Sequence, residues 1–100
     1  MMIAVAGGGA FGTALAVALA LDGKSVTLWA RDPIAVKTMQ DTRQNPRLPD
    51  ITLPAPIIVT NDLDNLFAAD IILLATPAQT LRGFLTEHAD HLAGKSLIAC

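Results

Sequence analysis

The sequence is poor in cysteine and in charge, and each shortage excludes a class of protein. Its single cysteine, Cys100, permits neither an internal disulfide framework nor a multi-cysteine metal site. Only 16% of the residues are charged and the net charge is −2, which argues against nucleic acid or an anionic membrane surface as the main partner. The charge thus leads us to expect neither partner. The single cysteine fits a protein of the reducing cytoplasm.

Long apolar runs and export signals are also missing. Gly, Asp or Pro interrupts every apolar stretch before it reaches the ~20 residues that a membrane span needs. The opening stretch, MMIAVAGGGAFG, has no basic segment, and glycines stand where a signal peptide has its apolar stretch. The sequence thus predicts a protein that is neither exported nor embedded in a membrane.

Apolar residues are abundant, at 52% of the chain, and their order predicts a fold. Such a composition favours strands that are buried on both faces, as in a parallel sheet covered by helices. It also suggests that part of the surface contacts further protein. We expect strands over 2–6, 25–30, 57–61, 70–76 and 95–100, helices over 10–23, 32–43, 62–69 and 77–94, and a proline-rich loop or edge segment over 44–56. Strands alternating with helices indicate one doubly wound α/β domain, with strand 70–76 at its centre.

Three glycines, Gly7, Gly9 and Gly12, fit the pattern G-x-G-x-x-G between a predicted strand and a predicted helix. In dinucleotide-binding domains the first permits the tight turn, the second lets backbone approach a pyrophosphate, and the third lets the helix pack on the sheet. Free amides near Ala10 and Phe11 would then face the phosphates. The pattern predicts a dinucleotide site, and the alternative is a turn that serves packing alone. The Gly-Lys-Ser/Thr of phosphate-loop NTPases is absent after Gly12.

The end of the second strand, LWARD, should select the cofactor. NAD-specific sites place an acid there for the ribose 2′-hydroxyl, whereas here Ala30 takes that position and Arg31 follows. A small residue beside a guanidinium suits a 2′-phosphate, so the sequence favours NADP(H). If the register differs by a residue or two, Asp32 is the acid and NAD(H) is favoured; otherwise Asp32 caps the next helix. Pro77 either lines the nicotinamide ribose or simply opens a helix.

The remaining polar and aromatic residues suggest no chemistry. His88 and His91 are three residues apart, but no third ligand is evident, so we expect no metal. Met39, Phe67 and Phe84 are interpreted as core or interface residues. The sequence offers no catalytic acid, base or nucleophile.

The chain resembles the bacterial NAD(P)-dependent glycerol-3-phosphate dehydrogenases over nearly all of its length. The similarity lies in GGGAFGTALA, VTLWARD, NPRLPDITLP and DIILLATPAQTLR. The departures are Phe11, where Trp or Tyr is common, Ala10 in place of a frequent Ser, and Asp50 in place of Gly. The loop also lacks the Tyr that the family has between Arg47 and Leu48.

The resemblance implies a truncated Rossmann-type NAD(P)-binding domain over 1–100, without the family's C-terminal helical domain and its substrate-polarising lysines. It implies reduction of dihydroxyacetone phosphate to sn-glycerol 3-phosphate, for phospholipid synthesis, by the complete enzyme, with a homodimer as a possible assembly. The chain alone is expected to be inactive. The candidate cofactor-binding residues, for NADP(H) or NAD(H), are Gly7, Gly9, Ala10, Phe11, Gly12, Arg31, Asp32 and Pro77.

Three alternatives stay open at this point. The chain could be the cofactor domain of another dehydrogenase, such as a ketopantoate reductase or a relative of 6-phosphogluconate dehydrogenase. It could be a non-catalytic module that binds NADP(H), or a fragment that binds nothing.

Overall fold

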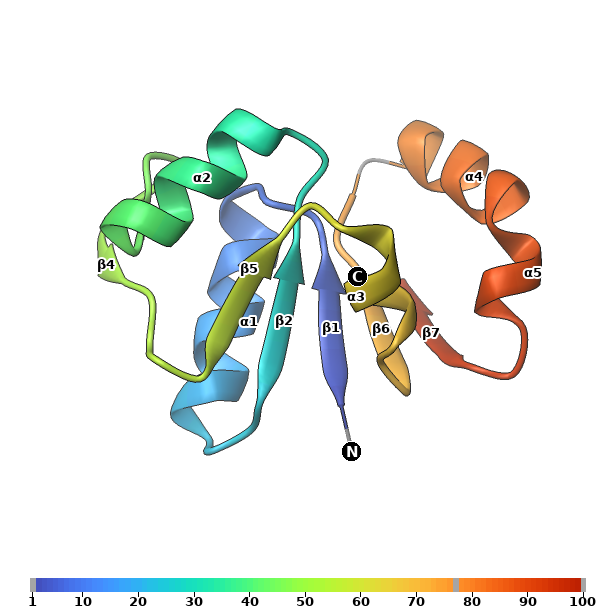
Figure 1. Ribbon diagram of the computed structural model, residues 1–100, viewed down its shortest axis with the longest axis horizontal. Coiled ribbons are helices and arrows are strands. Elements are labelled where there is room, and N and C mark those ends of the chain that lie inside the picture. Colours follow the sequence, from blue (N-terminus) through green and yellow to red (C-terminus); the bar gives the residue numbers. More distant parts are fainter. Residues whose placement is uncertain (1, 77, 100) are drawn as a thin grey trace.

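Five parallel strands form the main sheet, in the order β5-β2-β1-β6-β7. The computed structural model describes the backbone of residues 2–76 and 78–99 and the side chains of 2–76 and 82–99. The strands are β1 (Ile3–Ala6), β2 (Val26–Trp29), β5 (Ile57–Thr60), β6 (Ile71–Leu74) and β7 (Ser96–Ala99). Figure 1 shows all five pointing the same way, so their carboxyl ends share one edge of the sheet.

Helices cover both faces of this sheet, as the composition predicts. They are α1 (Ala10–Leu21), α2 (Pro33–Thr42), α3 (Leu63–Phe67), α4 (Ala78–Glu87) and α5 (Ala89–Leu92). Side chains alternate between the faces of a strand. Accordingly Val5 packs with α1 and α2 residues in one buried cluster, while its neighbours Ala4 and Ala6 belong to a second cluster with α3, α4 and α5 (Figure 1). Met39 and Phe84 are buried in these clusters, which confirms their prediction as core residues.

The helix ends follow signals that the sequence carries. Asp32 is the N-cap of α2: its carboxylate accepts a hydrogen bond from the Ile34 amide at 2.9 Å, and Pro33 follows at the first helical position. After α1, Gly23 takes a φ of +85°, and the Lys24 amide donates to a carbonyl in the last turn of the helix. This is the Schellman arrangement, in which glycine is preferred because side chains disfavour positive φ.

The proline-rich segment contains more regular structure than the sequence suggests. β3 (Gln44–Asn45) and β4 (Leu48–Thr52) form a separate antiparallel two-stranded sheet. The expectation of a loop or edge segment over 44–56 is confirmed, since both strands lie outside the main sheet. Pro49 fits within β4 because a two-stranded sheet consists only of edge strands, where a missing amide need not break a ladder.

Two other expectations are wrong in detail. The centre of the sheet is β1 and not β6, because the chain builds β2 and β5 on one side of β1 and then crosses to add β6 and β7 on the other. The helix predicted over 77–94 is divided into α4 and α5, since His88 takes a non-helical φ of −113° between them. The His88 ring packs there against Phe84 and Phe67, at centroid distances of 4.8 and 5.4 Å.

Large apolar side chains remain exposed on several elements. The most exposed are Phe11 and Leu21 of α1, Ile34 of α2 and Ile58 of β5, at 58%, 74%, 76% and 62%, and Leu97 and Ile98 of β7 are also exposed. These surfaces agree with the expectation that part of the molecule meets further protein. Within the described part of the chain, no helix is long and apolar enough to cross a membrane.

Two glycines without neighbours test how backbone conformation contributes to stability. A Cβ at Gly23 or at Gly83 would meet no atom within 4 Å, but only Gly23 has a positive φ. We expect Gly23→Ala to lower the free energy of unfolding by about 1–2 kcal/mol, through backbone strain alone. Gly83→Ala, within α4, should raise it by about 1 kcal/mol. Urea denaturation measures both, and equal effects of the two variants would contradict this account.

Candidate cofactor site

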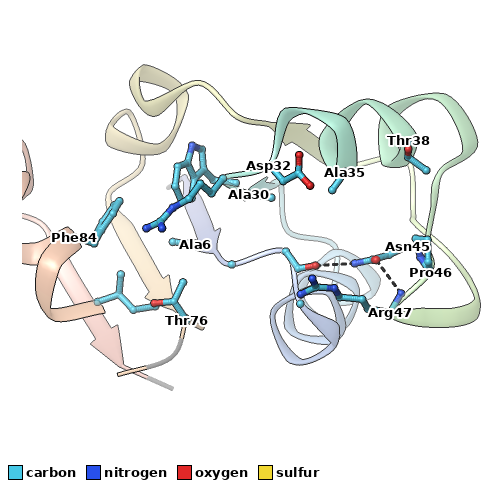
Figure 2. A pocket seen from close by; sticks show the side chains of 16 residues that line it. Ala6, Ala30, Asp32, Ala35, Thr38, Asn45, Pro46, Arg47, Thr76 and Phe84 are labelled. Carbon is cyan, nitrogen blue, oxygen red and sulfur yellow. Dashed lines mark hydrogen bonds between the residues drawn. The ribbon is translucent and has the colours of Figure 1, made fainter. Parts of the chain in front are cut away.

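A cavity of about 370 Å³ opens where β1, β2 and β6 end. Ala6, Trp29 and Leu74, the last residues of these strands, lie side by side in the register and all contribute to its wall. From β1 the chain adds β2 and β5 on one side, and then crosses over to add β6 and β7 on the other. The gap between β1 and β6 is therefore the topological switch point, where doubly wound folds bind ligands. Figure 2 shows Thr76 and Phe84 on one side of the cavity and the proline-rich loop on the other.

The glycine turn after β1 brings three backbone segments together. Gly7 has a φ of +140°, and a Cβ there would collide with the carbonyl oxygen of Ala75, just beyond β6. A Cβ at Gly12, in the first turn of α1, would collide with the carbonyl oxygen of Gly7. The structure thus confirms the tight turn expected of Gly7 and the close helix packing expected of Gly12.

Gly9 differs from these two because its surroundings are open. It is the N-cap of α1, and the nearest atom to a Cβ placed there would be Nη1 of Arg47, at 4.0 Å. No side chain among those described caps the first turn of α1, so its amides remain available to a ligand. Open space in front of free amides is the shape and charge that a dinucleotide pyrophosphate fits.

Gly8 has a role that the sequence did not indicate. A Cβ at Gly8 would lie 2.7 Å from the Cβ of Ala30, which is itself 4% exposed. A side chain at Gly8 would therefore press on that of Ala30, so this position of the turn favours glycine. The contact gives Gly8 a packing role beside Ala30.

Asn45 is the principal site residue that sequence reasoning missed. Its side chain is buried, and Nδ2 donates to the Gly8 carbonyl oxygen at 2.9 Å and to Thr13 Oγ1 at 2.7 Å. Its Oδ1 accepts from the Arg47 amide at 3.0 Å, and Figure 2 draws the bonds to Gly8 and Arg47 as dashed lines. The Asn-Pro pair signals a local turn, but no local signal points to a partner 37 residues away.

The charged side chains of the cavity are Arg31, Asp32 and Arg47. The Asp32 carboxylate is engaged as the cap of α2. Among the side chains of residues 2–76 and 82–99, no carboxylate oxygen lies within 4.0 Å of either guanidinium. Two unpaired guanidinium groups give the cavity a positive character that suits phosphate groups.

The cavity includes some of the predicted residues and excludes others. Gly7, Gly9, Arg31 and Asp32 line it, whereas Ala10, Phe11 and Gly12 are not part of its wall. Pro77 lies outside the described residues. The ring of His91 stacks on Phe67 at 4.9 Å, and no group of three or more His, Cys, Asp or Glu side chains suited to a metal occurs in the part of the chain that the structure describes.

Comparison with known proteins identifies the family. The profile described as "NAD-dependent glycerol-3-phosphate dehydrogenase N-terminus" matches residues 2–100. The chain belongs to this family. A glycerol-3-phosphate dehydrogenase [NAD(P)+] of Ruegeria sp. (strain TM1040) is 50% identical over 100% of the chain and 31% of the relative, and one of Paracoccus denitrificans (strain Pd 1222) is 49% identical over 100% and 30%.

A solved glycerol-3-phosphate dehydrogenase supports the same assignment. The crystal structure of the Coxiella burnetii enzyme superimposes with a TM-score of 0.89 at 30% identity, covering 98% of this chain and 31% of that one. These matches favour a glycerol-3-phosphate dehydrogenase cofactor domain over the ketopantoate reductase and 6-phosphogluconate dehydrogenase alternatives. The chain spans about a third of the length of the relatives that it matches.

One departure from the family pattern is explained by the backbone. Asp50, where the family has Gly, takes a φ of +67°. Asp tolerates this left-handed conformation better than most residues do, because its short side chain can hydrogen-bond locally. The loop therefore retains the backbone conformation that glycine favours.

The hydrogen bonds of the buried Asn45 side chain should stabilise the fold. Asn45→Ala removes the donor to the half-buried Gly8 carbonyl and to the buried Thr13 hydroxyl, so the free energy of unfolding should fall by about 1–3 kcal/mol. The control is Gln44→Ala at the adjacent, exposed position, where surface substitutions change stability by about 0.5 kcal/mol or less. Chemical denaturation compares the two, and equal losses would show that Asn45 is no special anchor.

Proposed function

We propose that this chain is the cofactor-binding part of an enzyme that reduces dihydroxyacetone phosphate to sn-glycerol 3-phosphate with NADPH or NADH. The observation that carries the proposal is the family match over 2–100, combined with a cavity at the switch point of the sheet. When bound, the nicotinamide would supply the hydride that reduces C2 of the ketone. The groups that polarise this ketone are expected in the part of the relatives that extends beyond the match.

In this proposal the glycine turn holds the pyrophosphate. Gly9 leaves the space, and the amides of Ala10 and Phe11 at the start of α1 donate to the phosphate oxygens, where the helix dipole favours negative charge. Gly7 and Gly12 act indirectly, because they let β1 and α1 approach closely enough to form the turn. The Phe11 ring is 58% exposed and would flank the bound cofactor.

Arg31 would select NADPH over NADH. It lines the cavity at the end of β2 without a carboxylate partner among the described side chains. Asp32, the competing candidate, already accepts a hydrogen bond from the Ile34 amide, which supports its interpretation as a helix cap. A guanidinium fork matches a 2′-phosphate, whereas the 2′-hydroxyl of NADH offers it little.

Because the space around Gly9 is open, a substitution there should weaken cofactor binding with little effect on folding. Gly9 has φ −76° and ψ −177°, which alanine adopts freely. We expect Gly9→Ala to change stability by about 1 kcal/mol or less and to weaken NADPH binding roughly tenfold or more, because its Cβ occupies pyrophosphate space. Calorimetric titration and thermal unfolding measure the two effects.

The contrasting variant is Gly12→Ala, whose Cβ would press on the Gly7 carbonyl. It should destabilise the fold by about 1–3 kcal/mol. Unchanged NADPH affinity in Gly9→Ala would place the pyrophosphate elsewhere.

The selectivity of Arg31 is tested by charge removal. A hydrogen bond to a charged group contributes about 1.5–3 kcal/mol, so Arg31→Ala should weaken NADPH about tenfold or more and leave NADH nearly unchanged. Lys37→Ala is the matched control, because Lys37 is an exposed cation of α2 outside the cavity wall. Equal losses for both cofactors would move the selecting role to Asp32 or another group.

A further inference from the structure

The proline-rich loop brings a second cation to the glycine turn. Nη1 of Arg47 stands 4.0 Å from the Cβ position of Gly9, the N-cap of α1. Figure 2 shows the Arg47 side chain lying alongside this turn. The N-terminus of a helix carries partial positive charge, so a guanidinium beside it is unfavourable unless an anion joins them.

The position of Arg47 is fixed by the buried side chain of Asn45. Pro46 restricts Asn45 to an extended backbone, and Asn45 Oδ1 accepts from the Arg47 amide at 3.0 Å. The other end of the Asn45 amide donates to the Gly8 carbonyl oxygen and to Thr13 Oγ1. The loop and the glycine turn are therefore one unit, and the Arg47 backbone is in place before a ligand arrives.

No acidic group of the described chain neutralises Arg47. Across side chains 2–76 and 82–99, no carboxylate oxygen is found within 4.0 Å of its guanidinium. The side chain lines the cavity and is exposed. A planar fork of donors in this setting matches the oxygens of a phosphate group, which it can bind through two parallel hydrogen bonds.

We infer that Arg47 binds the pyrophosphate of the dinucleotide opposite the first amides of α1, and that Asn45 is its positioning residue. The inference rests on the proposed function and adds a division of roles to it. Arg47 contacts the pyrophosphate that NADH and NADPH share, whereas Arg31 contacts the 2′-phosphate that only NADPH has.

A panel of four ligands separates these roles: NADPH, NADH, ADP-ribose and adenosine 2′-monophosphate. Arg47→Ala should weaken the first three about tenfold, and leave adenosine 2′-monophosphate, which has no pyrophosphate, within about twofold. Arg31→Ala should weaken only NADPH and adenosine 2′-monophosphate. Arg47→Lys keeps the charge without the fork and should fall between the parent and Arg47→Ala. Lys37→Ala controls for the loss of one positive charge.

The positioning role of Asn45 has its own readout. Asn45→Ala should reproduce the ligand pattern of Arg47→Ala, and the double variant should bind about as the Arg47 variant does, because both changes remove one interaction. A merely structural role would weaken all four ligands together.

Three outcomes would overturn the inference. The inference would be refuted if Arg47→Ala bound ADP-ribose within about twofold of the parent protein. The proposed function would still stand if Arg31→Ala weakened only NADPH and adenosine 2′-monophosphate. Equal weakening of ADP-ribose and adenosine 2′-monophosphate would show general attraction instead of pyrophosphate binding. Failure of the parent protein to bind any dinucleotide would refute the proposed function and this inference together.

Discussion

Three backbone segments meet at the end of β1 with no room for a side chain between them. Gly12 lies against the carbonyl of Gly7, and Gly7 lies against the carbonyl of Ala75. This contact holds the first turn of α1 over the end of the sheet, and it fixes β6 at the same point. The glycine turn formed in this way is part of the cavity wall, at the point where the strand order reverses between β1 and β6.

Hydrogen bonds between segments far apart in the sequence position the polar side chains around this glycine turn. Asn45 joins the proline-rich loop to the glycine turn, and so places Arg47 across from the N-terminus of α1. Arg31 enters from the end of β2. Cations from two separate segments thus line a cavity whose glycines leave space for phosphate. In the proposed function this cavity binds and orients a dinucleotide, and about two-thirds of the length of the relatives lies outside the matched part.

Local signals in the sequence predict most of this fold, and long-range contacts account for the rest. The glycine spacing, the Asp32-Pro33 helix start and the Gly23 stop each act within a few residues, and each is found as expected. The pairing of Gly8 with Ala30 and of Asn45 with the glycine turn depends on packing between distant segments. The β3–β4 hairpin was missed because its prolines disfavour strands in general, although they are tolerated at sheet edges.

In the proposed function, the first amides of α1 and the glycine turn hold a dinucleotide phosphate. A chemical-shift titration of the ¹⁵N-labelled protein with NADPH tests this contact amide by amide. The largest changes are expected on the amides of Gly9, Ala10 and Phe11, with the Gly23 amide at the opposite end of α1 unaffected. Binding that shifts Gly23 as much as Gly9, or no shift at the glycine turn under saturating NADPH, would show that the phosphate is not held there.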